Sequence, residues 1–124
     1  MTGGDVEEYK EILSWNKMDF LKRIRNNDVI AKKLVLLFVD EMPEVVESLH
    51  VAIEQLNYED ITALAHKING SSKNLGGDKV AYVVSQLEVA SKEQSNEQFD
   101  LFQSRLTTEF NQLITLLTTF LHEN

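Results

Sequence analysis

The chain has no cysteine, one proline and five glycines among its 124 residues. Without cysteine it can form neither a disulfide framework nor a zinc–thiolate site, and this composition suits a reducing compartment. Twelve basic against 20 acidic residues give a formal net charge of −8. An acidic balance argues against a nucleic-acid partner, because binding to a phosphate backbone needs a basic face. The longest dense apolar run, residues 32–42, is too short and too charged to span a bilayer.

The start of the chain, MTGGDVEEYKEIL, lacks the basic and then apolar pattern of a secretory signal. With 43% hydrophobic and 26% charged residues, the composition is that of an ordinary globular protein. The length predicts a single domain over residues 1–124. We therefore expect an acidic, cytoplasmic, monomeric protein that has no nucleic-acid or membrane partner.

Apolar residues recur every three or four positions along nearly the whole chain, which is the spacing of amphipathic α-helices. Pro43 falls inside the longest such stretch, where we expect a bend rather than a break because the apolar stripe keeps its phase on both sides. The predicted helices are residues 29–56, 58–75, 78–92 and 97–121, with an N-terminal helical segment at about 5–25. Short connections favour antiparallel neighbours, so the predicted fold is all-α, an antiparallel up-down four-helix bundle with an additional short N-terminal helix.

Residues 65–77, AHKINGSSKNLGG, combine a helical pattern with three of the five glycines. When successive residues are placed 100° apart, the apolar face of this helix falls within about 40° of one line. The residues on that line are Ile61, Leu64, Ala65, Ile68, Ser72 and Leu75. His66 lies roughly 140° away from the line on the same geometry. The phase therefore predicts that His66 points outward, on the same side as Gly70.

Gly70 lies one helical turn from His66 and leaves the approach to the imidazole open, although glycine costs a helix about 1 kcal/mol relative to alanine. Lys73 lies two turns beyond the histidine, and its flexible stem can reach back to a bound anion. Lys67 is about 100° round the helix and is the weaker candidate. An exposed imidazole with open access and nearby ammonium groups can accept a phosphoryl group as a neutral nucleophile.

These residues resemble the signature of histidine-containing phosphotransfer (HPt) domains, approximately His-x-Leu/Ile-Lys-Gly-Ser/Ala-Ser/Ala-x-x-Leu/Val-Gly. The matching positions are His66, Ile68, Gly70, Ser71, Ser72, Leu75 and Gly76. The stretches LLFVDEMPEVVESLHVAI and VVSQLEVAS are similar to the family's helices before and after the motif. The likeness covers about residues 14–90.

The resemblance implies a phosphorelay intermediate. His66 would take a phosphoryl group from the aspartate of one receiver domain and pass it to the aspartate of another. The implied partners are response-regulator receiver domains and a hybrid sensor histidine kinase. The receiver would supply Mg²⁺, so this chain would be a phosphoryl carrier with no cofactor and no ATP-binding or metal site of its own. In agreement, the sequence has no P-loop, no Gly-rich nucleotide motif and no cluster of metal ligands.

The resemblance also assigns roles around His66. The expected docking patch comprises Thr62, Ala63, Asn69, Gly70 and Lys73. The family usually has lysine three residues after the histidine, where this chain has Asn69, so Lys67 and Lys73 are the candidates to compensate the phosphoryl charge. The family tends to place Gln or Glu 22 residues beyond the histidine. That position is Glu88, a candidate to orient His66, with a solvated helix residue as the other interpretation.

Other functions fit less well. The main alternative is a non-phosphorylated helical-bundle module that binds a receiver domain or another signalling partner, and Asn69 is its best support. A histidine-kinase dimerisation domain usually has an acidic residue directly after the histidine, where this chain has Lys67. A metal–carboxylate bundle needs Glu-x-x-His pairs, but Ala63 lies three residues before His66. Glu47 lies three residues before His50, but it stands alone, so His50 and His122 are predicted to be ordinary surface histidines.

Overall fold

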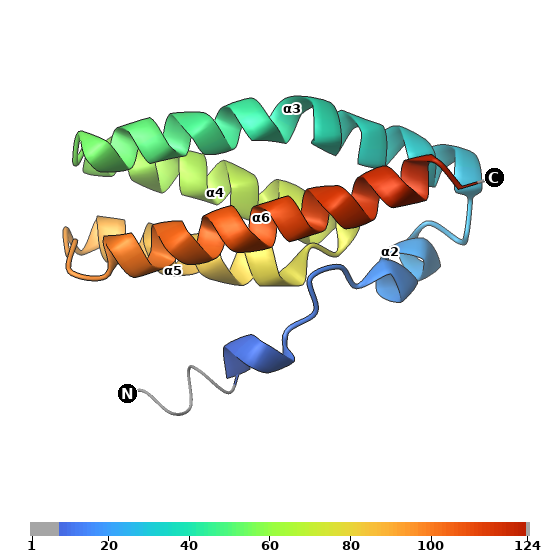
Figure 1. Ribbon diagram of the computed structural model, residues 1–124, viewed down its shortest axis with the longest axis horizontal. Coiled ribbons are helices and arrows are strands. Elements are labelled where there is room, and N and C mark those ends of the chain that lie inside the picture. The colour runs from blue at the N-terminus through green and yellow to red at the C-terminus, as the bar shows by residue number, and fades with distance from the viewer. Residues whose placement is uncertain (1–7, 124) are drawn as a thin grey trace.

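The computed structural model describes residues 8–123, and all the regular secondary structure within them is helical. Its helices are α2 (Lys17–Arg23), α3 (Asp28–Glu54), α4 (Tyr58–Leu75), α5 (Asp78–Lys92) and α6 (Phe99–Leu121). The helices α3 and α5 each pack against both α4 and α6, and the four lie side by side in Figure 1. The prediction of an all-α fold is confirmed. No helix in the described part is both long and apolar enough to cross a membrane.

Three asparagines begin helices in the same way. The side chains of Asn16, Asn27 and Asn57 each accept a hydrogen bond of 3.1 to 3.2 Å from the backbone N–H three residues further on. This contact satisfies one of the donors that the first turn of a helix leaves unpaired. The sequence therefore marks the starts of α2, α3 and α4 with one residue type.

The observed bounds differ from the expected ones at two of the long helices. The pattern placed helices at 29–56 and 97–121, but α3 ends at Glu54 and α6 begins at Phe99. Leu56 takes a left-handed conformation with φ 51°, which a right-handed helix cannot continue. The helix α3 does continue through Pro43. The helices α4 and α5 run over the residues that the apolar spacing indicates.

The expectation of helix over residues 5–25 is wrong in its middle, and its first residues, 5–7, lie outside the described part. Residues 8–11 are helical, but α2 begins only at Lys17. Between them the backbone bonds to the connection between α4 and α5 and to the first turn of α5. Asn16 N–H donates to the carbonyl of Gly76 at 2.7 Å, and Lys79 N–H donates to the carbonyl of Leu13 at 3.1 Å. Because these groups are bonded elsewhere, they cannot continue a helix.

Two aromatic side chains fasten this N-terminal segment to the bundle. Trp15 donates its Nε1–H to the carbonyl of Leu75 at 2.7 Å, and its ring meets Phe120 edge-on with the centroids 5.4 Å apart. Tyr9 donates its hydroxyl to Glu109 Oε2 at 2.9 Å. Burial, together with this hydrogen bond, raises the pKa of Tyr9 above its ordinary value, so the hydroxyl stays a donor.

Gly76 and Gly77 make the tight connection between α4 and α5. Gly76 has φ +88°, a conformation that side chains disfavour, and an added Cβ would lie 2.6 Å from the carbonyl oxygen of Asn16. Gly77 N–H donates to the carbonyl of Ser72 at 2.7 Å, and an added Cβ there would lie 2.7 Å from Leu113 Cδ2. The connection therefore needs glycine both for its backbone conformation and for close packing.

Gly76→Ala should lower the free energy of unfolding by about 2 kcal/mol or more, because left-handed strain of about 1 to 2 kcal/mol adds to the backbone clash. Gly70→Ala is the matched control, since an added Cβ there meets nothing within 4 Å. In a helix interior this change should raise stability by about 0.5 to 1 kcal/mol. Urea unfolding measures both values, and a Gly76→Ala protein as stable as the wild type would contradict the role given to Gly76.

Candidate functional site

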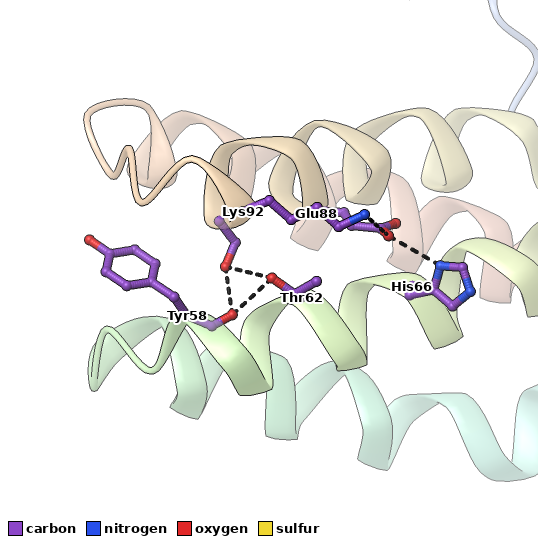
Figure 2. A network of polar contacts seen from close by, with 6 residues as sticks. Tyr58, Thr62, His66, Glu88 and Lys92 are labelled. Carbon is purple, nitrogen blue, oxygen red and sulfur yellow. Dashed lines mark hydrogen bonds and ion pairs between the residues drawn. The ribbon is translucent and has the colours of Figure 1, made fainter.

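His66 projects from the middle of α4, away from the core. Its side chain is 78% exposed, whereas Ala65 and Ile68 beside it are fully buried. The difference follows from the 3.6-residue period, which places successive residues 100° apart and so puts His66 outside the arc that faces the core. Figure 2 shows the imidazole at the side of α4 that lies next to α5. The ring is thus open to an approaching molecule while its helix is held firmly.

Glu88 on α5 contacts this ring from the neighbouring helix. Its Oε2 lies 3.1 Å from His66 Nδ1, and its side chain is only 13% exposed. A carboxylate can only accept a hydrogen bond, so this contact places the ring hydrogen on Nδ1. The lone pair is then on Nε2, the nitrogen on the other side of the ring. The geometry therefore leaves Nε2 as the ring nitrogen with a lone pair that could act as a nucleophile.

Lys92 contacts the same carboxylate. Its Nζ is 3.3 Å from Glu88 Oε2, and its side chain is 63% exposed. The two residues lie one turn apart on α5, the spacing at which oppositely charged side chains meet on a helix. Figure 2 shows Lys92, Glu88 and His66 joined in a row through the carboxylate. The expected site did not include Lys92, although this spacing within the predicted helix was a signal that could have found it.

A network of hydroxyl groups joins α4 to α5 beside the site (Figure 2). Thr62 Oγ1 lies 2.9 Å from the carbonyl oxygen of Tyr58 and 3.0 Å from Ser91 Oγ. Ser91 donates to the same carbonyl at 2.7 Å. Thr62 was expected in the docking patch, and the structure turns its hydroxyl toward α5. Its observed contacts hold the two helices in register.

The other residues expected in the site differ in how exposed they are. Ala63, Lys67, Gly70 and Lys73 are exposed, and Asn69 is half-buried. An added Cβ at Gly70 would meet nothing within 4 Å, so the surface beside the ring is open. Lys73 lines a hollow with Ile12, Tyr82 and Ser85 and lies two turns along α4 from His66. The lysine that forms an ion pair with Glu88, the carboxylate in contact with the imidazole, is Lys92 on α5.

Asn69 differs in character from the lysine that the family pattern places there. Its Oδ1 is buried and has no hydrogen-bond partner in the described part of the chain. A side-chain amide is uncharged, and its oxygen only accepts hydrogen bonds. Asn69 therefore adds no positive charge to the surface around His66. Across residues 8–123, no three His, Asp or Glu side chains are grouped so that they could hold a metal ion.

Comparison with known protein families identifies the family of this chain. The Hpt domain family matches residues 33–121, well over half of the chain, and this stretch contains both His66 and Glu88. The chain belongs to the Hpt domain family, and the resemblance inferred from AHKINGSSKNLGG is confirmed.

One solved structure shares the fold. The crystal structure of histidine-containing phosphotransfer protein B (HptB) from Pseudomonas aeruginosa PAO1 aligns with a TM-score of 0.79, covering 86% of this chain and 92% of that one. The two chains are 19% identical, so the likeness establishes the fold alone. The comparison with curated proteins gave no match.

The contact between His66 and Glu88 predicts one ring tautomer. We expect the neutral ring of the wild type to carry its hydrogen on Nδ1, as measured by ring ¹⁵N NMR. Glu88→Ala should remove this preference, because the acceptor that holds the hydrogen is gone. Glu93→Ala, at an exposed position at the end of α5, is the control and should leave the spectrum unchanged. A wild-type ring with its hydrogen on Nε2 would contradict the orientation described here.

Proposed function

We propose that the protein is a phosphorelay intermediate of two-component signalling. His66 takes a phosphoryl group from a receiver-domain aspartate and passes it to the aspartate of another receiver domain. The contact between His66 Nδ1 and Glu88 Oε2, at 3.1 Å, carries the proposal. It leaves Nε2 of an exposed ring as the nucleophile. Membership of the Hpt domain family supports the same chemistry.

The transfer needs little from this chain beyond the nucleophile. The lone pair of Nε2 attacks phosphorus, an N–P bond forms, and the P–O bond to the receiver aspartate breaks as that aspartate leaves as a carboxylate. The ring becomes a cation that keeps its hydrogen on Nδ1, and Glu88 stabilises the new positive charge. The reverse reaction on a second receiver passes the group onward. On this proposal the receiver supplies Mg²⁺, and this chain acts as a carrier without its own ATP-binding or metal site.

Open surface beside His66 supports docking of a protein partner. Gly70 leaves space on α4, and Ala63, Lys67, Asn69 and Lys73 complete the proposed patch on that helix. On the α3 side, Ile30, Leu34 and Leu37 are exposed apolar residues. A cavity of about 140 Å³ next to them is lined by residues of both helices, including Ser71 and Asn74 of α4. Exposed apolar surface of this kind often marks a protein interface, and a receiver domain is the partner that we propose for it.

The arrangement of the long helices supports the expected scaffold. In Figure 1 the chain runs leftward along α3, rightward along α4, leftward along α5 and rightward along α6. Short connections between such helices favour antiparallel packing. We therefore propose an antiparallel up-down four-helix bundle, with the N-terminal segment and α2 added outside it. His66 then lies midway along one helix, where a partner can approach without meeting a loop.

A second function is favoured by one observation. Asn69 stands where a lysine is usual, and its buried amide brings no charge to the site. A module that binds a receiver domain without taking its phosphoryl group would not need that charge. Binding to a receiver without any transfer of label is the outcome that would support this alternative.

Incubation with a receiver domain carrying ³²P on its aspartate tests the proposed function. The wild type should acquire acid-labile label, and His66→Gln should acquire none, because glutamine has no nucleophilic nitrogen. His50→Gln is the matched control and should be labelled like the wild type, since His50 Nδ1 contacts Gln103 Oε1 on the α3–α6 side of the bundle. Full labelling of the His66→Gln protein would refute the proposal.

Gly70→Gln tests the docking surface separately. The longer side chain should obstruct the receiver and slow transfer by about tenfold or more, the size of effect typical for a substitution in the centre of an interface. Stability should not fall, because the position is open and glutamine is a better helix former than glycine. Thr108→Gln, at an exposed position on α6, is the control and should transfer normally. If Gly70→Gln transfers at the wild-type rate, the receiver must dock on a part of the surface that does not include Gly70.

A further inference from the structure

The ammonium group of Lys92 has no role in the proposal so far, although it belongs to the site. Its Nζ is 3.3 Å from Glu88 Oε2, and the same oxygen is 3.1 Å from His66 Nδ1. One carboxylate oxygen therefore joins a cation and an imidazole, as Figure 2 shows. Because a single carboxylate serves two partners, a change in the charge of the ring must alter how the three groups pair.

Phosphorylation of Nε2 changes two charges at once. The ring becomes a cation with its hydrogen still on Nδ1, and the phosphoryl group brings about two negative charges, as phosphorylated side chains do. These negative charges arise next to Glu88 on a chain whose formal net charge is already −8. Without a cation near the phosphoryl oxygens, repulsion between the anions opposes the transfer.

The lysines of α4 are poorly placed to supply that cation. Lys67 points about 100° away from His66 around the helix. Lys73 lies seven residues along α4, which is about 10 Å at 1.5 Å per residue. Asn69 is uncharged, and its Oδ1 is buried. Lys92 approaches from α5 instead, and its 63% exposed side chain has room to move.

We infer that Lys92 and Glu88 exchange partners when His66 is phosphorylated. Before transfer, Lys92 neutralises Glu88 beside an uncharged ring. After transfer, Glu88 pairs with the cationic ring, and the ammonium of Lys92 moves to the phosphoryl oxygens. No proton leaves or joins Lys92 in this exchange. Lys92 thus compensates the charge that Asn69 cannot, and the inference rests on the proposed function.

Lys92→Met removes the ammonium group and keeps most of the stem. At equilibrium with a phosphorylated receiver, this variant should hold about three- to tenfold less label on His66, the effect of losing an exposed ion pair with a group that carries about two negative charges. Lys92→Arg should restore the label. Lys10→Met, at an exposed lysine of the N-terminal segment, is the matched control and should stay within about twofold of the wild type. Lys67→Met and Lys73→Met, measured beside it, test the lysines of α4 as the other source of the charge.

Two further measurements separate charge compensation from other effects of Lys92. Labelling by phosphoramidate, a small anionic donor that needs no docking surface, should fall in Lys92→Met by a similar factor. Thermal unfolding should stay close to that of the wild type, since an exposed ion pair contributes little stability.

The possible outcomes test the inference about Lys92 separately from the proposed phosphorelay function. A wild type that takes no label from a receiver would overturn both. A labelled wild type with an unchanged Lys92→Met protein would overturn the inference alone. A loss seen with the receiver but not with phosphoramidate would also overturn it, because Lys92 would then act in docking. A larger loss in Lys67→Met or Lys73→Met would assign the compensating charge to α4 instead.

Discussion

The register of α5 against α4 is the constraint on which the site depends. Gly76, with φ +88°, and Gly77, packed against Leu113, reverse the chain in a space that admits no side chain. This tight reversal brings His66 and Glu88, 22 residues apart, to 3.1 Å. Ser91 and Thr62 bond across the same two helices nearby, which keeps the register fixed. The N-terminal segment adds to this through Asn16, whose N–H donates to the carbonyl of Gly76.

The side chains of Glu88, His66 and Lys92 are buried to different extents, so they differ in how much space they have to move. Glu88 is held against the bundle, whereas His66 and Lys92 are mostly exposed. An exposed ion pair between residues one turn apart contributes only about 0.3 to 0.5 kcal/mol. Lys92 can therefore leave Glu88 at little cost once a more highly charged group is present. A largely buried carboxylate between two exposed partners is the arrangement that a change of partner needs.

The spacing of apolar residues predicted which side chains of a helix face the core and which face outward. It placed His66 outward and Ile68 inward, because the period of an α-helix relates neighbouring positions by a fixed angle. It could not show Lys92 against Glu88, which the spacing of charges along α5 indicates instead, or Thr62 turned toward Ser91, which depends on how two helices pack. The N-terminal segment shows the same limit. Its local pattern suggested helix, but Asn16 bonds to Gly76, far along the chain, and no local pattern encodes that contact.

The most direct test of the central claim is to determine which ring nitrogen carries the phosphoryl group. Protein with ¹⁵N-labelled histidine would be phosphorylated by a receiver domain, and the coupling between ³¹P and ¹⁵N would identify the bonded nitrogen. Because Glu88 holds the hydrogen on Nδ1, the account predicts one N–P bond, at Nε2 of His66. A phosphoryl group on Nδ1 of His66, or on His50 or His122, would contradict it.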